Sequence, residues 1–302
     1  MKSIIRDLEI CIPTWNSSLF LRQCLTQIRK TCEGLNYQVL ILDNQSTDET
    51  RTIAESFGCE VWEHKCSMPD ALNELFKRSR GHRTLFMHAD TILLHSDWFS
   101  LADKHLTDHC ILVSPQDIGC GPYTRPMGKD KPESSFMLFD TARLRKSRSI
   151  RLVQRFRFPW FPQRIINFYS ESVTQYIPAE LDKRGYQWKS MQVHVSSSTI
   201  DPIYDSSRVV PGQCWDDSLS TLHYGLGNFY SIDGVITHYH NWYDRILGGH
   251  PDCKEKSGIP VEYIAERTRQ FLHDFEANQV VIPTQPSAEQ EPRLIPVVAG
   301  AA

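Results

Sequence analysis

Three apolar segments within the first 90 residues decide the fold: Leu8-Glu9-Ile10-Cys11-Ile12-Pro13-Thr14-Trp15-Asn16, Val39-Leu40-Ile41-Leu42-Asp43 and Thr84-Leu85-Phe86-Met87-His88-Ala89-Asp90. Each has the length and apolar character of a buried strand, and each ends in polar residues. In an open α/β sheet, ligands bind just outside the carboxyl ends of the strands. The sequence therefore predicts a ligand site at this edge, where two carboxylates, Asp43 and Asp90, suit a metal ion.

Helical patterns separate these strands. Apolar residues recur at helical spacing between the first two strands, at Leu21, Cys24, Leu25, Ile28 and Cys32. After Asp43, Ser46 and Glu49 have the spacing of a capping box, with Thr47 as an alternative cap, and predict a helix that ends at Gly58. Strands that alternate with helices through residue 106 predict an α/β fold with a mostly parallel, Rossmann-like sheet flanked by helices.

Length and composition indicate one continuous domain. The chain has 302 residues, of which 40% are hydrophobic, enough for a large core. We expect residues 1–282 to form a single domain, with a ligand-binding half over 1–106 and a second half over 107–282. Residues 261–278 predict an amphipathic helix. Residues 283–302 are rich in Pro, Ala, Gln and Glu and predict a disordered tail.

Charge and cysteine usage exclude several classes of protein. The net charge of −3 does not favour a nucleic-acid partner. The nine cysteines include no Cys-x-x-Cys pair, which argues against a structural zinc site. No apolar stretch approaches the roughly 20 residues that cross a bilayer, and no leader peptide precedes the first strand. These features predict a cytoplasmic protein.

The same segments resemble the N-terminal half of the family 2 glycosyltransferases, which are inverting enzymes with the GT-A fold. The resemblance covers about residues 8–106 and rests on Ile12–Asn16, Leu42–Thr50, Ala71–Asn73 and His88–Asp90. It implies a GT-A fold and a nucleotide-sugar donor, with a UDP-sugar as the commonest case. The residues that it implies for the nucleotide site are Pro13, Thr14, Asn16, Asp43, Asn73, His88 and Asp90.

The resemblance also implies a metal site. In the family, the last residue of an Asp-x-Asp motif holds a metal ion on the diphosphate, and here that residue is Asp90. His88 replaces the first Asp, and a histidine after the last strand completes the metal shell, for which His238 fits best and His240 next. Imidazole suits a transition metal better than magnesium, so we expect Mn²⁺ to be preferred over Mg²⁺.

The second half must supply a base, because an inverting transfer needs a carboxylate to take the proton of the acceptor hydroxyl. Asp216 and Asp217 resemble the late acidic pair of the family, and we prefer them. Glu180 and Asp182 precede a Gly-Tyr pair that the family motif also carries, but with different spacing. This second pair stays open as the alternative.

A basic and aromatic segment lies between these parts. Residues 143–169 carry eight Lys and Arg residues, no acidic residue and several large aromatic residues. Such a mixture suits an anionic membrane surface or a lipid-linked acceptor. We prefer the interpretation as an acceptor-side lid whose aromatic residues pack inward and whose arginines stay hydrated, and single-stranded nucleic acid is a third ligand that such a mixture would suit.

We therefore predict a metal-assisted glycosyltransferase of polysaccharide biosynthesis that moves a sugar from a nucleotide-sugar to a glycan or lipid-linked acceptor. It would be cytoplasmic, with peripheral membrane contact through residues 143–169. Two alternatives remain. One is a non-catalytic nucleotide-sugar or glycan-binding protein, favoured by His88 in place of Asp. The other is a sugar nucleotidyltransferase, which would carry a glycine-rich loop where Pro13–Asn16 stands.

Overall fold

The computed structural model describes residues 6–116, 131–146, 174, 177–195, 213–215, 227–241, 244–249 and 261–277. The first part of the chain alternates strands and helices. Its elements are β1 (Leu8–Thr14), α1 (Ser18–Thr31), β2 (Tyr37–Asp43), α2 (Thr50–Ser56), β3 (Glu60–Glu63), α3 (Met68–Arg78) and β4 (Arg83–Met87). The four strands pair in parallel in the order β3-β2-β1-β4, as the pattern predicts.

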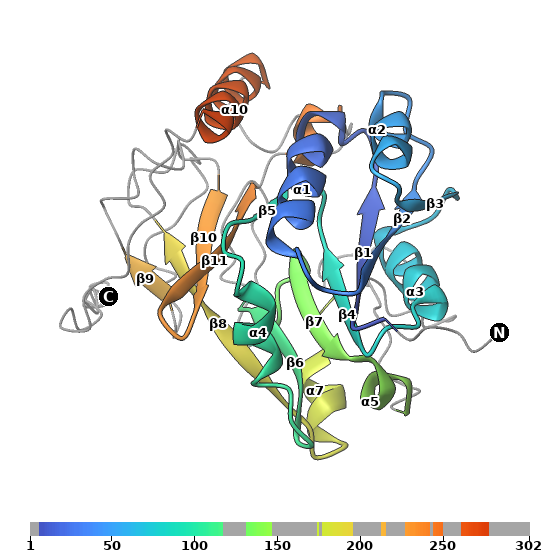
Figure 1. Ribbon diagram of the computed structural model, residues 1–302, viewed down its shortest axis with the longest axis vertical. Coiled ribbons are helices and arrows are strands. Elements are labelled where there is room, and N and C mark those ends of the chain that lie inside the picture. Colours follow the sequence, from blue (N-terminus) through green and yellow to red (C-terminus); the bar gives the residue numbers. More distant parts are fainter. Residues whose placement is uncertain are drawn as a thin grey trace, which may run out of the picture.

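The second part extends the same sheet. Its elements are β5 (Thr91–Leu93), α4 (Trp98–Asp103), β6 (Cys110–Pro115), β7 (Phe136–Asp140), α5 (Thr141–Lys146), α7 (Ile177–Asp182), β8 (Gln187–Val195), β9 (Gln213–Trp215), β10 (Gly227–Ile232), β11 (Val235–Asn241), α8 (Asp244–Leu247) and α10 (Val261–Glu276). The strand order continues from β4 as β7-β6-β8-β10-β11-β5, and β9 pairs with β8 (Figure 1).

The predicted α/β fold, a Rossmann-like sheet of parallel core strands flanked by helices, is confirmed, and the sheet also contains antiparallel strands. β7 runs antiparallel to both β4 and β6, and β10 and β11 form an antiparallel hairpin. Because of this reversal, the start of β7 lies beside the end of β4, where Phe136 pairs with Met87. The segment before β7 is thereby brought to the edge at which β1, β2 and β4 end.

Helices cover both faces of the parallel strands (Figure 1). On one face, Leu8, Ile10 and Ile12 belong to a core that includes residues of α1, α2 and α4. On the other face, Cys11 and Leu40 belong to a core that includes residues of α3, α5 and α7. This alternation follows from the period of two along a strand. α10 packs through Phe271 against Tyr239 of the β10–β11 hairpin, in a third cluster.

One helix start differs from the prediction. α2 begins at Thr50, and its N-cap residue Glu49 makes no side-chain capping bond. Ser46 instead donates its hydroxyl to Asp43 at 2.5 Å, so the expected capping box at Ser46 or Thr47 is wrong. Asp48 supplies the cap, because its Oδ1 accepts the backbone N–H of Thr50 at 3.0 Å. Within the described parts of the chain, no helix combines the length and apolar character needed to cross a bilayer.

Candidate metal and nucleotide site

Three side chains with metal-ligating atoms converge at the carboxyl end of β4. His88, Asp90 and His240 each offer one ligand atom, and these atoms lie within 4.8 Å of one another. Nε2 of His240 lies 3.4 Å from Oδ1 of Asp90, and Nδ1 of His88 lies 3.9 Å from the same oxygen. The two imidazole rings meet edge to face, with their centroids 5.4 Å apart.

Strand register explains why these residues meet. His88 and Asp90 follow β4 and precede β5, and β11 pairs with β5 so that His240 lies opposite Thr91. The backbone N–H of Asn241 donates to the carbonyl of Asp90 at 3.1 Å, which holds the end of β11 against this loop. His240 is 150 positions away from Asp90 in the chain, and the pairing of β11 with β5 brings the two residues together.

The structure brings His240, and not the preferred His238, to Asp90. His238 is fully buried, and its ring stacks between Phe136 at 4.4 Å and Tyr230 at 4.7 Å. Burial holds the pKa of His238 well below its usual value, and the charge on nearby His240 lowers it further. A neutral ring between two aromatic rings is a packing element of the core.

Carboxylates lie on both sides of His240. Nδ1 of His240 lies 2.9 Å from Oε1 of Glu133. The contact is an ion pair, because the N–H group of Nδ1 does not point toward the carboxylate as a hydrogen bond requires. Burial alone lowers the pKa of His240, but Asp90 and Glu133 outweigh burial and raise it to about 10. In the metal-free protein this imidazole is therefore a cation that links two carboxylates.

Asp244, on α8, is a further buried carboxyl group beside this cluster. It accepts a hydrogen bond from the hydroxyl of Ser17 at 2.8 Å. Burial raises the pKa of Asp244 well above its usual range, and the charge of Asp90 raises it further. The site therefore concentrates acidic groups in a space that water barely reaches, which favours a cation.

The donor set fits a divalent transition metal. Two imidazoles and a carboxylate are the ligand types that Mn²⁺, Fe²⁺ and Zn²⁺ accept in proteins. Asp90 is 6% exposed, and His88 is half-buried, so the cluster is open on the side of His88. Asp90 and His240 are the residues that would hold an ion, with His88 as a third ligand.

The loop after β1 is fixed by the loop after β2. Asn16 adopts a left-handed conformation with a φ of 48°, and its amide oxygen accepts the backbone N–H of Thr47 at 2.8 Å. The backbone N–H of Asn16 donates to the hydroxyl of Ser46 at 2.8 Å. Asp43 lies beneath both loops and accepts hydrogen bonds from Thr14 and Ser46.

Asp43 is only 1% exposed, and its carboxylate accepts hydrogen bonds from residues of both loops. Pro13 is half-buried and Thr14 is buried beneath the same loops. Asn73 lies on α3, half-buried, and its amide donates to the carbonyl of Pro69 at 2.7 Å.

The two candidate base pairs have different positions. Asp216 and Asp217 lie outside the described residues. Glu180 and Asp182 lie on α7, which precedes β8, and Gln187 at the start of β8 bonds to His109 before β6. Because β4, β6 and β8 run in the same direction, α7 lies at the sheet edge opposite the metal-ligating cluster (Figure 1).

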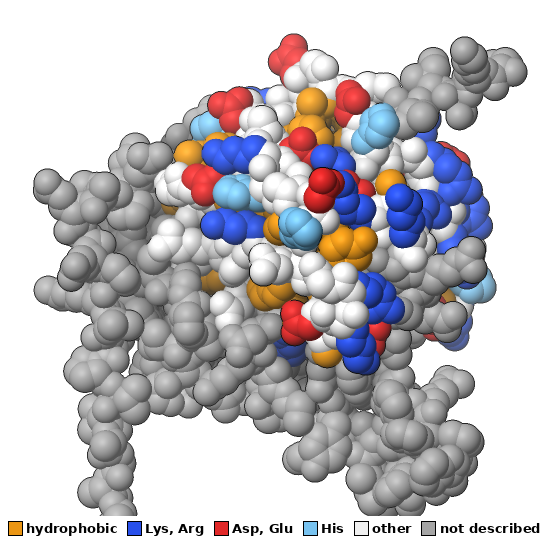
Figure 2. Space-filling view, turned by 90° about the horizontal axis from the view of Figure 1, so that it is seen from below, with side chains coloured by type: hydrophobic (Ala, Val, Ile, Leu, Met, Phe, Trp, Pro, Cys, Tyr) orange, Lys and Arg blue, Asp and Glu red, His pale blue; other side chains and the backbone are white. Residues whose placement is uncertain are grey.

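Glu180 is also paired with cations of its own helix. Lys183 and Arg184 each contact its carboxylate at 2.9 Å, and the hydrogen bonds from Lys183 and then Arg184 lower its pKa. Figure 2 views the molecule from this lower side, where basic and acidic side chains are interspersed. A carboxylate held by two cations and remote from the cluster is poorly placed to act as the base.

Most of the basic and aromatic segment lies outside the described residues. At its start, Arg143 forms ion pairs with Asp140 and Asp108, and Arg145 lies over the ring of Phe76 at 4.7 Å. These two arginines stabilise the packing of α5.

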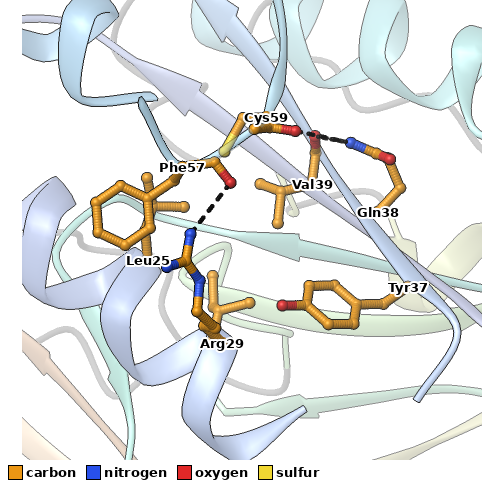
Figure 3. A pocket seen from close by; sticks show the side chains of 9 residues that line it. Leu25, Arg29, Tyr37, Gln38, Val39, Phe57 and Cys59 are labelled. Carbon is orange, nitrogen blue, oxygen red and sulfur yellow. Dashed lines mark hydrogen bonds between the residues drawn. The ribbon is translucent and has the colours of Figure 1, made fainter. Parts of the chain in front are cut away.

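A separate pocket lies between α1 and the start of β2, away from the metal-ligating cluster at the strand ends (Figure 3). Arg29 and Tyr37 line it, together with Phe57, whose carbonyl accepts a 3.5 Å hydrogen bond from Arg29. The metal-ligating residues do not line this pocket.

Sequence reasoning missed Glu133 and Asp244. Glu133 stands three residues before the buried strand that begins at Phe136. That position indicates a residue near the end of β4 only once β7 is known to run antiparallel to β4. Asp244 follows the His-rich strand by a few residues, and acidic residues near a candidate metal histidine are a signal that the sequence did offer.

Comparison with known sequences places this architecture in a protein class. Residues 9–168, more than half of the chain, match the family described as Glycosyl transferase family 2. The chain belongs to that family.

Relatives of known description share only part of the chain. A PGL/p-HBAD biosynthesis glycosyltransferase from Mycobacterium tuberculosis is 31% identical over 121 residues, which are 37% of this chain and 45% of the relative. The corresponding protein of Mycobacterium bovis matches equally. The match thus spans less than half the length of these relatives.

Solved structures resemble this one more loosely. The mannosyltransferase PcManGT from Pyrobaculum calidifontis, in complex with GDP-Man and Mn²⁺, has 14% identity and a TM-score of 0.46 over 62% of this chain and 55% of its own. TarS of S. aureus, residues 1–349, has 19% identity and a TM-score of 0.37 over 48% and 50% of the two chains.

Proposed function

We propose that this chain transfers a sugar, with inversion, from a UDP-sugar to a glycan or lipid-linked acceptor, assisted by a divalent metal ion. The observation that carries the proposal is the convergence of His88, Asp90 and His240 at the strand ends of a family 2 chain. A bound divalent ion would stabilise the negative charge that develops on the diphosphate leaving group. Because two of the three ligands are imidazoles, we expect Mn²⁺ to support activity better than Mg²⁺.

We propose roles for the other site residues as well. The loop that contains Thr14 and Asn16 would line the nucleotide, and Asp43 would act on the nucleotide through this loop, whose shape it holds. Asp217 or Asp216 would accept the proton of the acceptor hydroxyl. We also propose Pro13 and Asn73 as nucleotide contacts at the borders of this site.

The test is hydrolysis of nucleotide-sugar donors, measured with Mn²⁺, with Mg²⁺ and in excess chelator. Asp90→Asn and His240→Gln should each lower turnover by at least 10²-fold, because each removes a ligand of the ion. Asp97→Asn and His82→Gln are matched controls, since both residues are exposed and lie outside the cluster. Full turnover in chelator would refute metal assistance. Absence of turnover with every donor, together with nucleotide-sugar binding, would instead indicate a binding protein.

The base is tested separately on transfer to an acceptor. Asp217→Asn or Asp216→Asn should lower kcat by about 10²–10⁴-fold and leave donor affinity nearly unchanged, because a base acts on the acceptor. Glu180→Gln and Asp182→Asn serve as the comparison, and a large loss of kcat in either would move the base to α7.

A further inference from the structure

Glu133 occupies a specific position behind His240. Its Oε1 lies 2.9 Å from Nδ1 of His240, whereas the other ring nitrogen, Nε2, faces Asp90 at 3.4 Å. The imidazole therefore stands between the carboxylate of the metal-ligating cluster and a second carboxylate outside that cluster. Histidines that ligate metals commonly use the nitrogen that does not face the metal to contact a carboxylate, which fixes the orientation of the ring.

Glu133 is itself held by several bonds. The hydroxyl of Ser135 donates to Oε1 at 2.8 Å, and the hydroxyl of Tyr230 donates to Oε2 at 2.8 Å. The backbone N–H of Glu133 donates to Pro115 at the end of β6, also at 2.8 Å. With both oxygens engaged, this carboxylate is a fixed acceptor and is unsuited to take a proton from a substrate.

We propose that Glu133 is a positioning residue for the metal ion: its carboxylate, 2.9 Å from Nδ1 of His240, keeps a ring proton on Nδ1 and orients the ring, so that Nε2 faces Asp90 and is the nitrogen that would bind the ion. Tyr230 completes this arrangement, because its hydroxyl holds the second oxygen of Glu133 from the neighbouring strand β10. The proposal rests on the metal site of the proposed function.

Glu133 also contacts several strands of the sheet. Glu133 precedes β7, its backbone is tied to β6, and its side chain touches β10 and β11. The side-chain hydroxyl of Ser114, on β6, donates to the carbonyl of Glu133 at 3.1 Å. The orientation of His240 is thus fixed by strands from the second half, while Asp90 comes from the first half.

The test is binding of Mn²⁺ and Co²⁺ to the full chain, without donor or acceptor. Glu133→Ala should weaken Mn²⁺ binding by about 10–100-fold, as is typical when the group behind a metal-bound histidine is removed. Glu133→Gln should fall between Glu133→Ala and the wild type, because its amide oxygen still accepts one hydrogen bond. The visible absorption of bound Co²⁺ should change in Glu133→Ala, which a loss of stability alone would not produce.

Two controls separate this proposal from the proposed function. His240→Gln should abolish tight Mn²⁺ binding, and Glu60→Gln, an exposed carboxylate, should not affect it. If Glu133→Ala and Glu133→Gln bind both ions as the wild type does while His240→Gln does not, the role of Glu133 is refuted and the metal site stands. If the wild type binds neither ion, the metal site itself is refuted. Should Glu133→Ala not fold, Glu133→Gln and Tyr230→Phe carry the same comparison.

Discussion

At the scale of the residue, the two histidines of β11 have different surroundings although only Tyr239 separates them in the chain. His238 is enclosed by Phe136 and Tyr230, and His240 faces Asp90. The spacing from the end of the strand favoured His238, but the register between β11 and β5 decides which ring reaches the metal-ligating cluster. Sequence spacing alone does not contain that register.

We predict that His238→Phe leaves Mn²⁺ binding within a few-fold of the wild type, because Phe fills a similar space between two aromatic rings. The free energy of unfolding should fall by about 1–3 kcal/mol, because the Phe ring is larger than imidazole and the contact of His238 Nδ1 with the Thr237 hydroxyl is lost. Calorimetric titration with Mn²⁺ and urea unfolding measure the two quantities. A loss of Mn²⁺ binding as large as in His240→Gln would return His238 to the metal shell.

At the scale of the element, one carboxylate stabilises the starts of two helices. Oδ2 of Asp48 accepts the N–H of Ser18, the first residue of α1, and Oδ1 accepts that of Thr50, the first residue of α2. Burial alone would raise the pKa of Asp48, but the hydrogen bonds from Thr50 and Ser18 outweigh it and lower the pKa from 3.8. A lowered pKa in the folded state stabilises that state wherever the group is ionised.

We therefore predict that Asp48→Ala lowers the free energy of unfolding by about 1–2 kcal/mol at pH 7. The difference from the wild type should persist above pH 5 and shrink as the pH falls through 3.8 and below, because protonation removes the same hydrogen bonds in the wild type. Urea unfolding of both proteins at a series of pH values from below 3.8 to 7 measures this difference in the free energy of unfolding. Asp97→Ala is the control, since Asp97 precedes α4 without a side-chain capping bond. A difference that grows toward low pH would contradict the prediction.

The hairpin of β10 and β11 depends on a close backbone approach. A Cβ atom on Gly227 would overlap the carbonyl of His240 and lie 2.8 Å from the hydroxyl of Tyr239. We predict that Gly227→Ala displaces β11, lowers the free energy of unfolding by about 1–3 kcal/mol and weakens Mn²⁺ binding. Gly34→Ala is the matched control, because a Cβ there meets no atom within 4 Å and only its positive φ is strained. Equal Mn²⁺ affinity in the wild type and Gly227→Ala would show that this contact does not position His240.

At the scale of the whole molecule, the parallel strands and the amphipathic helix α10 (Val261–Glu276) were predictable from local patterns, whereas the strand pairing of the second half was not. The strands that end at Thr14, Asp43 and Met87 are local apolar runs with turn signals, so sequence periodicity suffices. The reversal of β7 depends on pairing between distant strands, which no local pattern records. The same distinction applies to the candidate site. Asp90 was predictable because it follows an apolar strand, whereas Glu133 and Asp244 lie near the metal-ligating cluster only through tertiary packing.

The last prediction concerns the contact between α8 and the loop after β1. α8 returns to the loop after β1, where Asp244 accepts from Ser17 and the amide of Asn16 donates to the carbonyl of Gly248 at 3.2 Å. Burial, and then the charge of Asp90, raise the pKa of Asp244 well above its usual range, and a neutral amide at this position would still offer Ser17 an acceptor oxygen.

Asp244→Asn should therefore keep the bond to Ser17 and change the free energy of unfolding by less than about 1 kcal/mol. Asp244→Ala leaves the Ser17 hydroxyl without this acceptor, so the loss should be about 1–3 kcal/mol. Urea unfolding of both variants in chelator, beside Ser17→Ala, measures the contrast. If Asp244→Asn were as destabilising as Asp244→Ala, the amide oxygen would not replace the carboxyl oxygen as the acceptor of Ser17, and the prediction would be wrong.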